Sequence, residues 1–170
     1  SIFVDNTASG SVSAYYQRIL EESISISTPN KIAMSSTYAE YQSLKKAADD
    51  HGVKFMYETN VGAGLPVITT LNGLTNSGDK ILKIEGVLSG SLSFIFNNFK
   101  AGESFYEIVK QAQELGYTEP DPRTDLSGLD VRRKLLILAR EAGLSLEAEA
   151  VEIENILPVQ LDFSTKSFPV

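Results

Sequence analysis

The chain has 170 residues, and a composition of 42% hydrophobic and 22% charged residues is enough to build a core of its own. The net charge of −7 argues against binding to nucleic acids or anionic membranes, and a chain with no cysteine and one histidine, His51, excludes disulfides and thiolate metal sites. No apolar run approaches the roughly 18 residues that span a membrane and no signal-like segment opens the chain, so we expect a cytoplasmic protein.

Strands and helices alternate over the first 57 residues. Apolar runs predict strands at residues 2–4, 24–28 and 53–57, the first of them buried, and helical spacing predicts helices at 9–22 and 38–51. Such alternation is typical of a parallel sheet in the α/β class. The pattern changes near Glu58, where we place the start of a second domain.

The second domain is predicted to mix helices with strands. Its periodicity indicates helices at residues 66–74, 92–99, 104–115 and 128–141, and strands at 80–88 and 150–156. Gly116 would end the helix at 104–115, because glycine accepts the left-handed conformation common after a helix.

A carboxylate-rich loop lies between the last two predicted helices. Pro120 and Pro122 fix their own φ angles and hold the preceding residues, Glu119 and Asp121, in extended geometry. Asp125 follows on the same loop. Because the backbone directs these carboxylates, the loop is suited to binding a small polar molecule.

The predicted helix at 128–141 carries charge on a largely apolar face. Asp130 and Lys134 stand four residues apart and share that face, which Glu141 continues. A partly buried lysine beside a carboxylate can act as an acid or base, because burial lowers its pKa and negative charge raises it again. Without the neighbouring loop, an ordinary helical ion pair would be the simpler interpretation. Three arginines are expected to face solvent on the other side: Arg132, Arg133 and Arg140.

Five segments then combine into a recognisable order. They are VDNTAS at residues 4–9, TPNK at 28–31, YETNVGAGLP at 57–66, IEGVLSGSLS at 84–93 and EPDP at 119–122. Over residues 1–158 this order resembles homoserine dehydrogenase, and especially the dehydrogenase part of bifunctional aspartokinase–homoserine dehydrogenases. The resemblance implies NAD(P)-dependent interconversion of L-homoserine and L-aspartate 4-semialdehyde, in the biosynthesis of threonine, methionine and isoleucine.

The resemblance also implies a role for individual residues. Lys134 would give a proton to the aldehyde oxygen, Asp125 would orient Lys134, and Lys31 would lie near the reacting carbon. Substrate binding falls to Glu119, Asp130 and Ser91, and cofactor contacts fall to Thr7, Lys31 and Gly116. A structural monovalent cation, usually sodium, would be held by Glu58 and by the carbonyl oxygens of Val61, Ala63 and Leu65.

Two domains follow from the resemblance. Residues 1–57 would be the C-terminal part of a Rossmann-like NAD(P)-binding domain, and residues 58–170 an incomplete α+β catalytic and dimerisation domain with a mixed sheet. The family's Gly-rich pyrophosphate turn is missing from the sequence, so we expect a fragment that is inactive by itself. The choice between NADP and NAD stays open. A dimer would use the strand within residues 81–88, and the parent chain could carry an aspartokinase domain.

Two other interpretations remain. Glu119, Asp121, Asp125 and Asp130 could form a divalent-metal site of a lyase or hydrolase, although Lys134 disfavours a dication and the spacing is not that of a calcium loop. Alternatively, the chain is an inactive assembly module of a larger enzyme.

Overall fold

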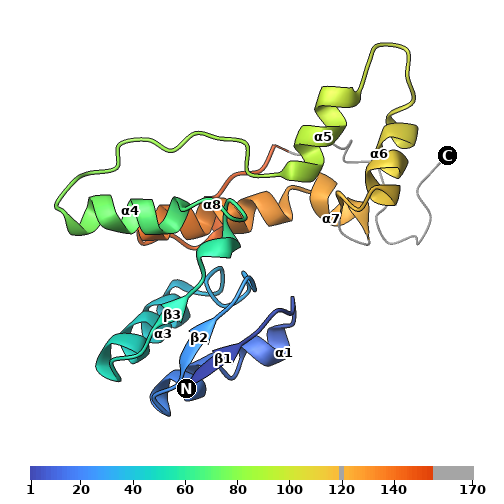
Figure 1. Cartoon of the computed structure of the whole chain (residues 1–170). Coiled ribbons are helices and arrows are strands. Elements are labelled where there is room, and N and C mark those ends of the chain that lie inside the picture. Colours follow the sequence, from blue (N-terminus) through green and yellow to red (C-terminus); the bar gives the residue numbers. More distant parts are fainter. Residues whose placement is uncertain (119–120, 155–170) are drawn as a thin grey trace. The chain divides into compact units, whose positions relative to one another are not determined.

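The structure is a computed structural model that describes residues 1–118 and 121–154 (Figure 1). The chain divides into two compact units, one made of Ser1–Ile84 with Arg133–Val151, the other of Glu85–Arg132 with the segment that begins at Glu152. Among the described residues, every helix is too short or too polar to cross a membrane.

The first unit contains a parallel sheet with the strand order β1-β2-β3. The strands are β1 (Ile2–Val4), β2 (Ser25–Ser27) and β3 (Phe55–Met56). Phe3 lies opposite Ile26, and Ile26 lies opposite Phe55, so apolar side chains align across the sheet. The three strands predicted within residues 1–57 and the α/β class are thereby confirmed. Side chains alternate along a strand, so Ile2 and Val4 project to the face opposite Phe3, which packs against the core. Ile2 and Val4 are 63% and 59% exposed, and the expectation that this strand is buried was wrong.

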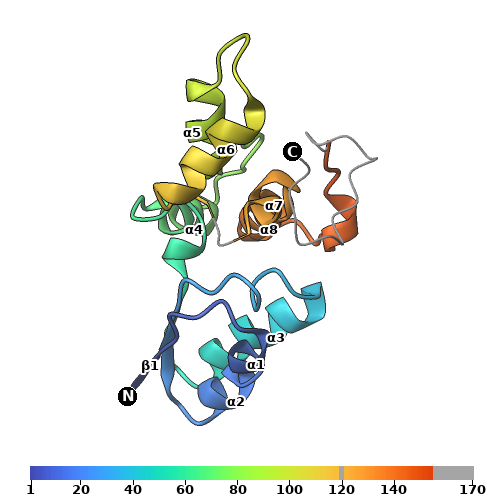
Figure 2. The ribbon, with the colours of Figure 1, turned by 90° about the vertical axis from the view of Figure 1, so that its right-hand side faces the viewer.

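Helices cover one face of this sheet (Figure 2). They are α1 (Gly10–Ser13), α2 (Tyr16–Glu21) and α3 (Tyr38–Asp50), so the helix predicted at residues 9–22 is interrupted near Ala14. Leu20 of α2 and Leu44 of α3 pack with Ile26 of the sheet in one buried core. The unit continues with the 3₁₀ turn η1 (Glu58–Asn60), the helix α4 (Val67–Asn76) and the turn η2 (Ala148–Ala150).

A buried carboxylate joins the ends of β1 and β2. Asp5, which is 2% exposed, accepts hydrogen bonds from the Tyr16 hydroxyl, from the Thr7 amide (2.7 Å) and from the Asn30 side chain (3.1 Å). Burial alone would raise the pKa of Asp5, but these hydrogen bonds outweigh it and lower the pKa to about 2. The ionised Asp5 carboxylate therefore holds in place the loops that follow β1 and β2.

In the part that the structure describes, the regular elements of the second unit are all helices. It contains α5 (Gly90–Asn98), α6 (Phe105–Glu114), α7 (Pro122–Leu126) and the first residues of α8 (Leu129–Glu141). α5 and α6 lie side by side in both ribbon views (Figures 1 and 2). Ile95, Val109 and Leu126 are the centre of its small core.

Two predicted strands are not formed by the described residues. Residues 80–88 and 151–154 have no regular structure, and residues 155–156 lie outside the described range. Leu82 and Val87 are 91% and 79% exposed. A strand needs hydrogen bonds to a neighbouring strand, and no second strand pairs with this segment within residues 1–118 and 121–154. The mixed sheet expected beyond residue 58 is therefore not seen in the described part of the chain.

Removing the Tyr16 hydroxyl from the Asp5 cluster should lower stability by an amount that depends on pH. Tyr16→Phe keeps the ring in the core but removes the shortest hydrogen bond to Asp5, so we expect a loss of about 1–3 kcal/mol in the free energy of unfolding at pH 7. A carboxylate with a lowered pKa stabilises the fold above its unfolded pKa, and this contribution disappears as the pH falls towards 2. Denaturant unfolding between pH 7 and pH 2 should therefore show a shrinking difference between the two proteins.

Tyr15→Phe is the matched control, because Tyr15 is 63% exposed and precedes Tyr16. It should change stability by less than about 0.5 kcal/mol. A difference between Tyr16→Phe and the unsubstituted protein that is constant with pH would contradict the assignment of Asp5 as its partner.

Candidate functional site

Three loops that begin at one edge of the sheet carry the predicted cofactor and cation residues of the first unit. Thr7 follows β1, Lys31 follows β2 and Glu58 follows β3. The strands are parallel, so their carboxyl ends meet at the same edge, where open α/β sheets bind ligands. Thr7 is exposed and Lys31 is half-buried.

Side chains tie these loops to one another. Asn30 donates to the Asp5 carboxylate (3.1 Å) and to the Ser9 carbonyl oxygen (3.0 Å), which connects the first two loops. Asn60 is 1% exposed, and its amide nitrogen, in the orientation that satisfies its neighbours, donates to the Pro29 carbonyl oxygen (3.0 Å). These hydrogen bonds hold the three loops together as one surface.

Glu58 is bound to the start of α4. Its Oε1 accepts from the Ile68 amide (2.8 Å) and its Oε2 from the Thr69 amide (2.8 Å) and hydroxyl. Burial would raise the pKa of Glu58, but these donors outweigh it and hold the pKa below its usual range. Glu58 is therefore an ionised carboxylate at a helix N-terminus, where negative charge is favoured.

The turn after Glu58 fits the chemistry of a hard monovalent cation. Gly62 and Ala63 both have positive φ, 84° and 51°, and a Cβ on Gly62 would lie 2.6 Å from a Val67 methyl group. The predicted ligand residues, Val61, Ala63 and Leu65, follow the ionised carboxylate of Glu58 within seven positions of the sequence. The oxygen atoms of a carboxylate and of peptide carbonyls are the donors that hard cations prefer. The Leu65 carbonyl also accepts from the Val67 amide (2.9 Å).

In the second unit, a chain of hydroxyls ends on Asp125. The Ser89 and Ser91 hydroxyls lie 2.9 Å apart, and Ser91 donates to Asp125 Oδ1 at 2.7 Å. All three residues are buried, and Ser89 also accepts from the Leu92 amide at the start of α5. Two of the predicted site residues, Ser91 and Asp125, are thus brought into contact from positions far apart in the sequence.

Gly116 has a structural explanation at its position after α6. Its φ is 75°, and its amide donates to the Gln113 carbonyl oxygen (3.0 Å), as in a helix that ends on glycine. It was predicted both to end the helix and to contact the cofactor, and the first of these is confirmed.

The carboxylate loop differs from a metal site. The Asp121 carboxylate accepts a bidentate pair of hydrogen bonds from Arg123, Nε to Oδ1 at 2.8 Å and Nη2 to Oδ2 at 2.6 Å. These hydrogen bonds hold the pKa of Asp121 below its usual range. No group of three or more metal-binding side chains occurs in the residues that the structure describes. Glu119 lies outside those residues. The arginine pairing of Asp121 disfavours the divalent-metal interpretation, because it neutralises one expected ligand.

Helix α8 carries Asp130 and Lys134 on one face, both half-buried, as the periodicity predicted. The expectation for Arg140 was wrong. Arg140 is 3% exposed and donates to the carbonyl oxygens of Met34 (3.0 Å), Ser36 (2.9 Å) and Leu146 (2.9 Å). The Met34 and Ser36 carbonyls come from a segment distant in the sequence, so helical periodicity could not identify them as partners.

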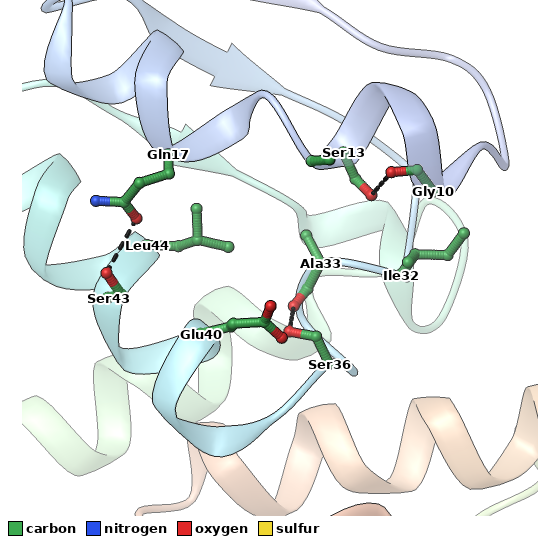
Figure 3. Close-up of a pocket in the computed structure, with 10 residues that line it drawn as sticks. Gly10, Ser13, Gln17, Ile32, Ala33, Ser36, Glu40, Ser43 and Leu44 are labelled. Carbon is green, nitrogen blue, oxygen red and sulfur yellow. Dashed lines mark hydrogen bonds between the residues drawn. The ribbon is translucent and has the colours of Figure 1, made fainter.

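Sequence reasoning also missed an open pocket and a buried ionic cluster. The pocket, of about 490 Å³, lies between α1, α2 and α3 and is lined by Ser13, Gln17, Ser36 and Ser43 among others (Figure 3). Ser43 donates to Gln17 across it (3.1 Å), and its lining differs from the predicted site residues. The ionic cluster surrounds Glu141, for which the only sequence signal was its place on the charged face of the helix.

Models of known families match both parts of the chain. Residues 66–166 match the homoserine dehydrogenase model, and residues 1–58 match the model of the NAD-binding domain of homoserine dehydrogenase. The second match confirms the nicotinamide-cofactor domain at the level of the family.

Known proteins agree with these matches. The chain is 53% identical to a bifunctional aspartokinase/homoserine dehydrogenase of Haemophilus influenzae, over 92% of this chain and 19% of that protein. It is 48% identical to a homoserine dehydrogenase of Schizosaccharomyces pombe, over 95% of this chain and 44% of that protein.

A solved structure supports the fold. A hyperthermophilic archaeal homoserine dehydrogenase in complex with NADPH is 29% identical, with a TM-score of 0.74, over 83% of this chain and 43% of that one. The chain therefore spans less than half the length of these relatives. Since the homoserine dehydrogenase model matches more than half of its residues, the chain belongs to the homoserine dehydrogenase family.

Proposed function

We propose that the protein containing this chain catalyses the NAD(P)-dependent interconversion of L-homoserine and L-aspartate 4-semialdehyde. The observation that carries the proposal is the half-buried Asp130 and Lys134 on one face of α8, inside the region that matches the homoserine dehydrogenase model. The relatives named above, which are homoserine dehydrogenases alone or joined to aspartokinase, support the same activity.

The proposed chemistry assigns proton transfer to the protein. The nicotinamide cofactor, when bound, supplies or accepts the hydride. Lys134 donates a proton to the aldehyde oxygen during reduction and takes it back during oxidation, which avoids a free alkoxide. We propose that Asp125 orients Lys134. Its buried position and its hydrogen bond from Ser91 support that assignment, because an anchored carboxylate holds one direction.

Substrate and cofactor contacts complete the proposal. We propose that Glu119, Asp130 and Ser91 bind the amino and hydroxyl groups of homoserine. The cofactor contacts are Thr7, Lys31 and Gly116, with Lys31 beside the reacting carbon. The position of Thr7 and Lys31 at the carboxyl ends of adjacent parallel strands supports the first two. The NADPH in the archaeal relative favours NADP over NAD as the first cofactor to test.

We also propose that sodium is bound by Glu58 and the carbonyl oxygens of Val61, Ala63 and Leu65, where it would stabilise the turn and take no part in the reaction. An aspartokinase domain in the parent chain is supported by the Haemophilus influenzae relative. A homodimer and a cytoplasmic location stay predictions. The exposed side chains of Leu82 and Val87 support a dimer surface within residues 81–88.

Replacing the proposed proton donor tests the function directly. In the parent protein with its complete nucleotide-binding domain, Lys134→Ala should lower kcat for NADP-dependent homoserine oxidation by about 10²–10⁴-fold, the usual contribution of a positioned acid–base group. Cofactor absorbance measures the rate, and titration of NADPH fluorescence should give an unchanged Kd.

The matched control is Arg133→Ala, which removes an exposed positive charge from the adjacent position of the same helix. It should retain kcat within about twofold. Equal losses in the two variants would contradict a specific role for Lys134, and a parent protein without homoserine-dependent turnover would contradict the function itself.

Removing sodium tests the proposed cation site. Thermal unfolding of the parent protein should shift to a lower Tm when sodium chloride is replaced by choline chloride at equal ionic strength, because a cation that binds only the folded state stabilises it. The Glu58→Gln variant, which lacks the ligand charge, should show no such shift. Glu107→Gln, an exposed acidic residue in the first turn of α6, should respond as the unsubstituted protein does. A sodium dependence that survives in Glu58→Gln would place the cation elsewhere.

A further inference from the structure

The C-terminal end of α8 carries a buried carboxylate with three donors. Glu141 Oε1 accepts from the hydroxyls of Tyr57 (2.8 Å) and Tyr41 (2.9 Å), and Oε2 accepts from the Lys45 ammonium (3.0 Å). The Glu141 side chain is fully buried, whereas Lys45 is 38% exposed. Each donor comes from the nucleotide-binding part of the first unit: Tyr41 and Lys45 from α3, and Tyr57 from the end of β3.

The two tyrosines are permanent donors to this carboxylate. Burial, and then the negative charge of Glu141, raise the pKa of Tyr57 and of Tyr41 far above the usual value. Both hydroxyls therefore keep their protons well above neutral pH, and each donates to Glu141.

Arg140 fixes the same end of the helix from another direction. Its guanidinium is fully buried and donates to carbonyl oxygens of Met34 and Ser36, in the segment that follows Lys31. It also lies over the Tyr41 ring, 5.3 Å from the centroid. Two adjacent residues of α8 thus bind three different parts of the nucleotide-binding domain.

The position of Glu141 on the helix connects this anchor to the proposed proton donor. Glu141 lies two helical turns beyond Lys134, and at 3.6 residues per turn the two side chains project from nearly the same face. Helices transmit rotation and axial shift as rigid rods over such short distances. Anchoring Glu141 therefore sets the direction in which Lys134 projects.

We propose that Glu141 is a positioning residue, which sets the rotation and axial position of Lys134 relative to the loops that carry Lys31 and Glu58. Tyr57 is its most direct connection to that edge, because it immediately precedes Glu58. The inference rests on the proposed function, since it assigns the purpose of the anchor to the proton donor.

Stability alone is a weaker explanation for this cluster. Taking charged groups out of water costs free energy, and well-packed apolar side chains of similar volume often give equal or greater stability. An ionic cluster with several directed hydrogen bonds, by contrast, accepts one arrangement of its parts. This property suits a helix whose lysine must meet a reacting oxygen, because small displacements at such sites cost large factors in rate.

The test is a set of double-mutant cycles in the parent protein. Tyr57→Phe removes one hydroxyl and leaves the ring packing, and Glu141→Gln removes the charge. Each substitution is made alone and in combination with Lys134→Ala. For every variant, the single-turnover rate of NADP reduction by homoserine and the Kd for NADPH are measured. We expect the single-turnover rate to fall about tenfold in Tyr57→Phe and by more in Glu141→Gln, with an unchanged Kd for NADPH. In the Lys134→Ala background, either substitution should lower the rate by less than a further twofold.

Two neighbouring lysines provide the matched control. Lys45 binds Glu141, whereas Lys46 pairs with the exposed Asp50 on the same helix (2.6 Å). Lys45→Met should lower the rate severalfold, and Lys46→Met should retain it within twofold. The comparison separates the buried cluster from loss of a lysine in α3 generally.

Specific outcomes would overturn the inference. If Tyr57→Phe lowers the rate by the same factor with and without Lys134, the cluster acts independently of that lysine. If Lys45→Met and Lys46→Met have equal effects, the contact with Glu141 is irrelevant. If Glu141→Gln fails to fold, the Tyr57→Phe cycle decides by itself. A parent protein without homoserine-dependent turnover would instead overturn the proposed function, together with this inference.

Discussion

Asp5 is a charged side chain in the core of a small α/β unit, and the arrangement of the candidate site depends on how its charge is satisfied. Its carboxylate is shielded from water, so each hydrogen bond to it is worth more than the same bond at the surface. Tyr16 connects it to the helix layer, Thr7 to its own loop and Asn30 to the neighbouring loop. One ionised group therefore adds side-chain hydrogen bonds to the sheet bond from the Asp5 amide to the Ser27 carbonyl oxygen, where the two strands end.

The same principle recurs at the C-terminal end of α8. Glu141 is also fully buried, and its three donors belong to elements that follow different strands. Arg140 adds bonds to main-chain carbonyls, whose positions do not depend on side-chain rotamers. In both clusters a buried charge fixes the directions in which proposed ligand-binding or reacting residues project. Apolar packing, being non-directional, could bring these elements together without fixing those directions.

Much of the local structure could be predicted from the sequence. The strands β1 to β3 and the helices α3 to α6 and α8 are local patterns of period two or 3.6, and they occur within a few residues of the predicted ranges. The segment 80–88 has an equally good strand pattern but forms no strand in the described residues. Helices satisfy their backbone hydrogen bonds internally, whereas a strand depends on a partner that its own sequence does not specify.

The sequence by itself determined the family, the α/β class and the residues proposed for chemistry, because motifs and periodicity are properties of short segments. Only the tertiary structure decided which of those residues have fixed partners. Ser91 reaches Asp125, Glu58 binds the start of α4, and Arg140 turns inward rather than to solvent. Each of these contacts joins segments that lie apart in the chain. The burial of a charge is decided by donors and acceptors from elsewhere in the fold, which no local pattern specifies.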